Sequence, residues 1–72
     1  MKISYHRDTD SLYIDLSART SAESQEVSPG VVLDFDVDGG LVGIDIEHAS
    51  EKLDLSEFSV SEFPVNPNRK TA

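Results

Sequence analysis

Apolar and polar residues alternate with a period of two over most of residues 1–47, which is the spacing of half-buried β-strands. Two short runs of this kind are separated by the polar segment 6–10, so they predict a first antiparallel hairpin. After a small polar loop, residues 23–27 could also extend, before a turn or bulge favoured by Pro29-Gly30. The apolar positions of the two runs are Ile3 and Tyr5, then Leu12, Ile14 and Leu16.

A second hairpin is predicted by the longest alternating stretch, residues 31–47. Its two halves are rich in β-branched residues and flank Asp38-Gly39-Gly40, where glycine can adopt the positive φ of a tight turn. Gly43, inside the second half, is interpreted as a close-packing glycine. The side chains assigned to the core are Val31, Leu33, Phe35, Val42, Ile44 and Ile46.

The alternation stops after Glu47. Residues 48–53 contain helix formers and no β-branched residue, and Ser50 could cap them, so one or two helical turns are expected. The predicted fold class is α+β, with a small antiparallel β-sheet of two hairpins and about four strands followed by a short C-terminal helix. We assign residues 1–54 to a single domain and residues 55–72 to a C-terminal extension that is expected to be partly disordered.

The central acidic stretch also matches the spacing of a calcium loop. Asp34, Asp36 and Asp38 are followed by Gly39, five further residues and Asp45, as in loops whose acidic side chains wrap around one ion. Such a loop needs a helix on each side, whereas both flanks here have strand spacing. We therefore favour the hairpin, in which alternate carboxylates line one face about 7 Å apart. Divalent-ion binding by this loop stays an alternative.

The charge of the chain is strongly negative and unevenly distributed. The net charge is −8, and Lys52 is the only base among eleven acids between Glu23 and Glu62. An acidic surface repels nucleic-acid phosphates and attracts cationic partners. A basic protein partner is therefore expected and a nucleic acid is not. The alternative is that the acids only keep a small domain soluble.

Other kinds of chemistry find little support in the composition. The absence of cysteine excludes disulfides and thiolate metal sites. No apolar run approaches the roughly 20 residues of a membrane span, and the first residues are strand-like where a signal peptide would be apolar, so we expect a cytoplasmic location. His6-x-Asp8-x-Asp10 could hold a metal, but a solvated turn is favoured. We predict no catalytic residue, no cofactor, no metal site and no membrane contact.

A series of short motifs in fixed order runs through residues 1–53. They are Tyr5, Asp10, Leu12-Tyr13-Ile14 and Leu16, then Val27, Pro29-Gly30-Val31-Val32-Leu33-Asp34, Asp38-Gly39, Val42-Gly43-Ile44, Ile46 and Ala49-Ser50. In this order and spacing the chain resembles the YuzE-like small bacterial proteins, a DUF2283-type family of unknown function. The resemblance implies a small antiparallel sheet with a helix after the last strand, and it brings no established catalytic residue. Some members are thought to be encoded beside small toxin-like proteins, which implies an antitoxin role.

These observations predict a non-enzymatic module that binds another protein. An acidic strand face would meet a basic partner, such as a small basic toxin, and apolar residues after the helix would add contact. The main alternative is a self-associating homodimer in which edge strands or the segment around Phe58 pair across a two-fold axis. The candidate interaction residues are Asp34, Asp36, Asp45 and Glu47 in the hairpin, with Leu55, Phe58 and Phe63 after the helix.

Overall fold

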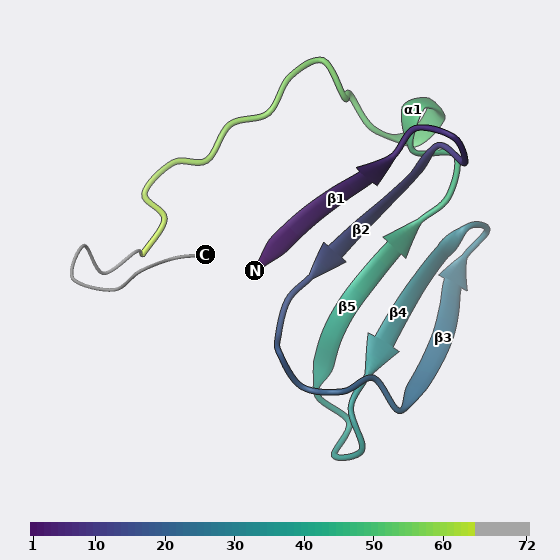
Figure 1. Cartoon of the computed structure of the whole chain (residues 1–72), viewed down its shortest axis with the longest axis vertical. Helices are drawn as coiled ribbons and strands as arrows, with labels where there is room; N and C mark the ends of the chain where they lie inside the picture. The colour runs from purple at the N-terminus through teal and green to yellow at the C-terminus, as the bar shows by residue number, and fades with distance from the viewer. Residues whose placement is uncertain (65–72) are drawn as a thin grey trace.

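The chain folds into a five-stranded antiparallel sheet with a single helical turn at one end (Figure 1). The computed structural model describes residues 1–64, so the part of the predicted extension from 65 to 72 lies outside the described residues. No helix in the described part is long and apolar enough to cross a lipid bilayer. The elements are β1 Lys2–His6, β2 Ser11–Asp15, β3 Glu23–Ser28, β4 Val31–Phe35, β5 Leu41–Ile46 and α1 Ala49–Lys52.

Two hairpins build most of the sheet, as the alternation predicts. β1 pairs with β2 and β4 pairs with β5, and β2 also pairs with β5 so that the hairpins join side by side. The resulting strand order is β1-β2-β5-β4-β3. The predicted antiparallel sheet with a short helix after it is therefore confirmed, while the number of strands is corrected from about four to five.

The additional strand is β3, which forms one edge of the sheet. All of its residues are exposed, so its sequence lacks the alternation of a half-buried strand. It turns into β4 at Pro29-Gly30, where the register shifts between Glu26 and Ser28 and Gly30 adopts a φ of 76°. β3 is thus held by backbone pairing with β4 rather than by burial of its own side chains.

Register across the strands gives the sheet two chemically different faces, because directly paired residues share a face and neighbours along a strand alternate. On one side of the sheet, every residue pair from β1 through β2 and β5 to β4 joins two apolar residues. We call this side the apolar face, and it comprises Ile3, Tyr5, Leu12, Ile14, Val31, Leu33, Ile44 and Ile46. The alternate positions form the polar face, which includes Ser4, Tyr13, Asp15, Ser24, Val32, Asp34 and Asp45.

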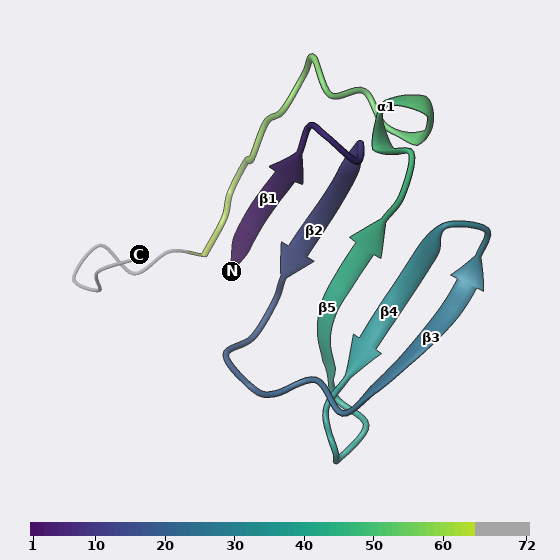
Figure 2. The same ribbon diagram turned by 45° about the vertical axis from the view of Figure 1, so that its right-hand side comes forward.

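Within residues 1–64, no second layer covers the apolar face. Helix α1 lies at the end of the sheet where β5 stops, and the segment after it runs past the β1–β2 turn and along the outer side of β1 (Figure 1 and Figure 2). Val42 and Ala49 are the only buried apolar side chains of the described part, and none of its large side chains is fully buried. A sheet is normally stabilised by packing its apolar face against another layer. Residues 1–64 do not supply that layer.

Candidate functional site

The polar face is organised around Asp34 in β4. Tyr13 on β2 donates its hydroxyl hydrogen to Asp34 Oδ2 over 2.8 Å, and Ser24 on β3 donates to Asp34 Oδ1 over 2.6 Å. Tyr13 reaches across β5 because Gly43 lies beneath its ring, and a Cβ at Gly43 would overlap the Tyr13 hydroxyl group. The close-packing interpretation of Gly43 is therefore confirmed, and one hydrogen-bonded network ties β2, β4 and β3 together over β5.

The charges of the polar face act on this network. Acceptance of the hydrogen bond by Asp34 favours the protonated phenol and raises the pKa of Tyr13, and burial and the nearby carboxylates of Asp15 and Asp45 act in the same direction. Asp34 and Asp45 lie on this face as the sequence predicts. Tyr13 and Asp15 are not among the interaction residues predicted from the sequence, although both follow the same alternation along β2.

Asp36 does not belong to the acidic face on which the sequence places it. Its side chain is buried at 6 % exposure, accepts hydrogen bonds from the backbone N–H groups of Asp38 at 2.9 Å and Gly40 at 2.8 Å, and pairs with Arg19 at 2.9 Å. The backbone hydrogen bond from Gly40 is the largest cause that lowers the pKa of Asp36. The expectation fails because β4 ends at Phe35 and the register shifts there, so the strand alternation does not continue to residue 36.

The carboxylates of the calcium pattern therefore point in different directions. Asp34 bonds across the polar face, and Asp36 turns into its own loop. Within residues 1–64, one group of three potential metal ligands comes together within 4.8 Å, and it consists of Asp10, His48 and Glu51. None of the calcium-pattern residues belongs to that group. The segments on either side of the loop are the strands β4 and β5, as the favoured hairpin interpretation predicts.

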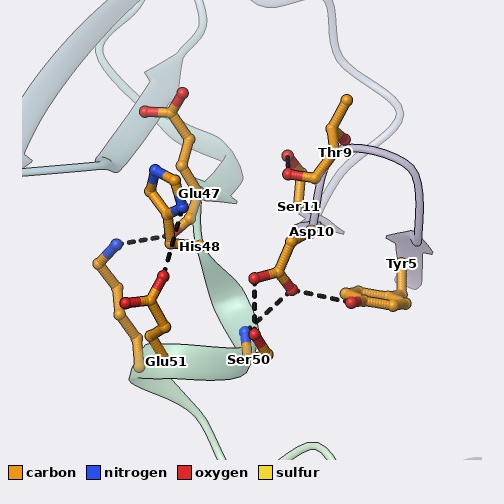
Figure 3. Close-up of polar contacts among 9 residues, drawn as sticks. Tyr5, Thr9, Asp10, Ser11, Glu47, His48, Ser50 and Glu51 are labelled. Carbon is orange, nitrogen blue, oxygen red and sulfur yellow. Dashed lines mark hydrogen bonds and ion pairs between the residues drawn. The ribbon is translucent and has the colours of Figure 1, made fainter.

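Asp10 holds α1 against the β1–β2 turn (Figure 3). Its carboxylate accepts hydrogen bonds from the Ser50 backbone N–H at 3.0 Å, the Ser50 hydroxyl at 2.6 Å and the Tyr5 hydroxyl at 2.8 Å. Its carbonyl oxygen accepts the N–H of Ala49 at 2.9 Å. Ser50 is thus not the helix cap that the sequence predicts, because it lies inside the first turn and His48 precedes the helix. We call Tyr5, Asp10 and Ser50 the helix clasp.

The hydrogen bonds of the helix clasp also shift the pKa values of its own residues. Hydrogen bonds from Ser50 and then from Tyr5 lower the pKa of Asp10 below its ordinary 3.8, and the bond to Asp10 raises the pKa of Tyr5. Beside the clasp, His48 Nδ1 lies 3.5 Å from Glu51 Oε2. Since the Asp10 carboxylate is already engaged in three hydrogen bonds that position α1, we assign this group of side chains a structural role.

The apolar side of the sheet carries a groove of about 520 Å³ next to the segment that follows α1. The floor of the groove is the part of the apolar face on β1 and β2, and its wall comes from residues 53–58. Leu55 and Phe58 line the groove, and Phe58 still exposes 76 % of its surface. Phe63 is exposed and is not part of the lining. The groove therefore has an apolar floor and a wall that closes it incompletely.

The candidate interaction residues consequently fall on opposite sides of the sheet. Asp34 and Asp45 lie on the polar face, whereas Leu55 and Phe58 stand beside the apolar face. Glu47 is exposed just beyond β5 and contributes its backbone to a contact with Gly30. One flat partner surface cannot cover both sets. The single acidic and apolar binding surface expected from the sequence is divided in two.

A family model described as a protein of unknown function, DUF2283, matches residues 2–50. The match includes all five strands and the three residues of the helix clasp, and it stops before the residues that form the wall of the groove. No curated protein and no solved structure matches the chain. The apolar and polar faces thus lie within the matched region, and Leu55 and Phe58 lie outside it.

Proposed function

The chain belongs to the DUF2283 family of unknown function, and from its surfaces we propose that it is a non-enzymatic protein-binding module. The binding surface is the apolar face of the sheet. The observation that carries this proposal is that eight apolar residues on adjacent strands share one face, while no other element of residues 1–64 is layered over it. Large exposed apolar patches on small domains mark interaction surfaces.

The arrangement of side chains supports this choice of surface. The outermost residues of the face, Ile3 on β1 and Tyr5 beside it, are 44 % and 43 % exposed. On the opposite edge, β3 continues the same face with Glu23 and Gln25, which pair with Phe35 and Leu33. An apolar centre with a polar rim is the usual composition of a protein interface.

The groove adds a recess at one end of this surface. Its floor is apolar, and its incompletely closed wall leaves room for an apolar side chain of a partner to insert beside Phe58. Buried anchors of this kind contribute much of the binding energy at protein interfaces. We therefore expect contact with a partner to extend from the sheet into the groove.

Site-specific photo-crosslinking in cells tests the proposed surface. A photoreactive phenylalanine analogue in place of Ile3 or Phe58 should give protein products above the mass of the monomer. The same analogue in place of Ser4, the neighbour of Ile3 on the polar face, should give few such products. The analogue in place of Val37, which is 85 % exposed in the β4–β5 turn, should also give few. Crosslinks that form only from Ser4 would contradict binding through the apolar face.

A second candidate function uses the polar face. Asp15, Asp34 and Asp45 share that face, so it fits a basic protein, and a small basic toxin encoded beside this chain would be such a partner. Co-expression with the product of the adjacent reading frame tests this role. Co-purification with rescue from toxicity is the expected result, and a lack of both would remove the antitoxin hypothesis. The partner would then be sought through the apolar face alone.

A further inference from the structure

We propose that the partner of the apolar face is the same face of a second copy of this chain, so that two sheets pack into a two-layer sandwich around a two-fold axis. This inference rests on the proposed binding function of the apolar face and names its occupant. It differs from pairing through edge strands, because the sheets would stack and their outer strands would stay unpaired.

The chemistry of the face suits contact with itself. Its eight residues carry no charged side chain, and the only polar atom among them, the Tyr5 hydroxyl, is already engaged by Asp10. An unpaired charge buried in an interface is costly, so an uncharged surface suits a self-complementary contact across a two-fold axis. A second copy supplies such a surface with matching dimensions and an equal share of branched aliphatic residues.

The strong negative charge of the chain does not oppose this arrangement at the centre of the contact, because Glu23, the acid of β3 on this side of the sheet, lies at its rim. Asp15, Asp34 and Asp45 project from the polar face, away from the proposed contact. Packed sheets lie about 10 Å apart, so carboxylates on the two outer faces would be separated by roughly 20 Å. Salt screens charges over about 8 Å at physiological ionic strength. The repulsion between the two copies is therefore mostly screened, although the net charge is −8 on each.

The residues of the apolar face keep surface that a second copy can bury. Ile3 and Tyr5 expose 44 % and 43 % of their surface, and the other six residues of the face are half-buried. Each of the eight side chains can therefore gain burial when a second sheet packs on it.

Stacking would also complete the core. Leu33 and Ile44 are directly paired in the middle of the sheet and remain only half-buried. Side chains from two facing sheets interdigitate when the sheets stack, and they bury each other without a helix layer. The two-layer dimer thus provides the missing second layer from a second copy of the chain.

The test is the oligomeric state of the full chain with a matched pair of variants. Sedimentation velocity over a series of concentrations should give twice the 7.9 kDa mass of one chain. Leu33→Lys, on the apolar face, should weaken dimerisation by at least tenfold. Val32→Lys, the adjacent half-buried residue on the polar face, should leave it unchanged. A strict monomer for the unsubstituted chain would overturn the proposal.

A second measurement keeps the proposal testable if Leu33→Lys fails to fold. A mixture of isotope-labelled and unlabelled chains allows nuclear Overhauser contacts between copies to be separated from contacts within one copy. Contacts between copies should involve methyl groups of Leu33, Ile44 and Ile14. Contacts confined to β1 or β3 would show edge pairing and would overturn face-to-face stacking. Monomers that still crosslink to another protein through Ile3 would refute the dimer and leave the proposed binding function intact.

Discussion

The two faces of this sheet are built from the same strands, but they differ in how far their side chains find partners within the chain. On the polar face, Asp34 accepts hydrogen bonds from Tyr13 and Ser24, so strands that are not neighbours are tied together within one chain. On the apolar face, paired residues such as Leu33 and Ile44 meet each other but no covering layer within residues 1–64. Within the described residues, the polar face is held by its own hydrogen bonds and the apolar face has no layer packed on it.

If the apolar face is the proposed binding surface, this difference separates the contacts that stabilise the chain from those that bind a partner. Hydrogen bonds are directional and can be satisfied within a single layer, whereas apolar burial needs a second surface. The polar network can keep the strands in register while the apolar face stays available to another chain. Substitutions on the polar face should therefore change folding of the single chain, and substitutions on the apolar face should change association.

The largest expected effect comes from filling the space under Tyr13. Gly43→Val places a side chain where the Tyr13 hydroxyl lies, so Tyr13 has to move and Asp34 loses one donor. We expect the free energy of unfolding to fall by about 3 kcal/mol, measured by urea denaturation at one fixed protein concentration. In a Tyr13→Ala background the same substitution should cost much less. Equal losses in both backgrounds would show that the two residues are not coupled.

A smaller effect is expected at the helix clasp. Asp10→Ala removes the acceptor of Ser50 and Tyr5, so α1 and the groove wall that follows it should loosen. We expect a decrease in Tm of about 5 °C and faster amide exchange at Ala49 and Ser50. Asp8→Ala, in the same turn and exposed, is the control and should change neither quantity. Normal exchange protection of α1 in Asp10→Ala would refute the role of the clasp.

The pH dependence of stability separates the hydrogen-bonded carboxylates from the apolar contacts. The pKa values of Asp10 and Asp36 are lowered from their ordinary 3.8 in the folded chain. Their contribution is therefore fully present above the unfolded pKa and is lost as pH falls through the lowered folded pKa. Urea denaturation between about pH 2 and pH 6 should show this loss below pH 3.8. Asp10→Asn and Asp36→Asn should each flatten the curve, and an unchanged slope in both variants would contradict these assignments.

The smallest effect on folding is expected for exposed acids of the polar face. Asp15→Lys reverses a charge that is paired in register with Lys2 at the rim of the sheet. Its free energy of unfolding should change by no more than about 0.5 kcal/mol. If a basic protein binds this face, association should slow and its salt dependence should weaken in stopped-flow measurements. An unaltered association rate would place such a partner elsewhere.

Alternation in the sequence predicts the sheet well where strands are half-buried. It identifies both hairpins and the apolar residues Leu33 and Ile44, because one buried face imposes a period of two. It does not count β3 among the strands, although residues 23–27 could extend, because all residues of β3 are exposed. It also misplaces Asp36, because the register shift after Asp34 ends the alternation. These failures occur where backbone pairing and loop hydrogen bonds, rather than burial, determine the local structure.

Sequence spacing could not predict the helix clasp, and it could not predict that the candidate interaction residues lie on two sides of the sheet. Asp10 and Ser50 are forty positions apart, and no local pattern connects a turn residue with a helix so distant in the chain. The side of the sheet on which Leu55 and Phe58 lie depends on the direction in which the chain leaves α1. Periodicity describes faces within an element, but it does not fix how an irregular segment returns to the sheet.

The most direct test of the uncovered apolar face compares two neighbouring residues in the unsubstituted, full-length protein. Val32 and Leu33 are both half-buried in the single chain, and they point to opposite faces of β4. A soluble paramagnetic gadolinium chelate enhances the relaxation of methyl protons that solvent can approach. We expect strong enhancement for the Val32 methyl groups and protection of the Leu33 methyl groups, because another chain covers the apolar face. Equal enhancement at both residues would contradict the proposal that this face is a binding surface.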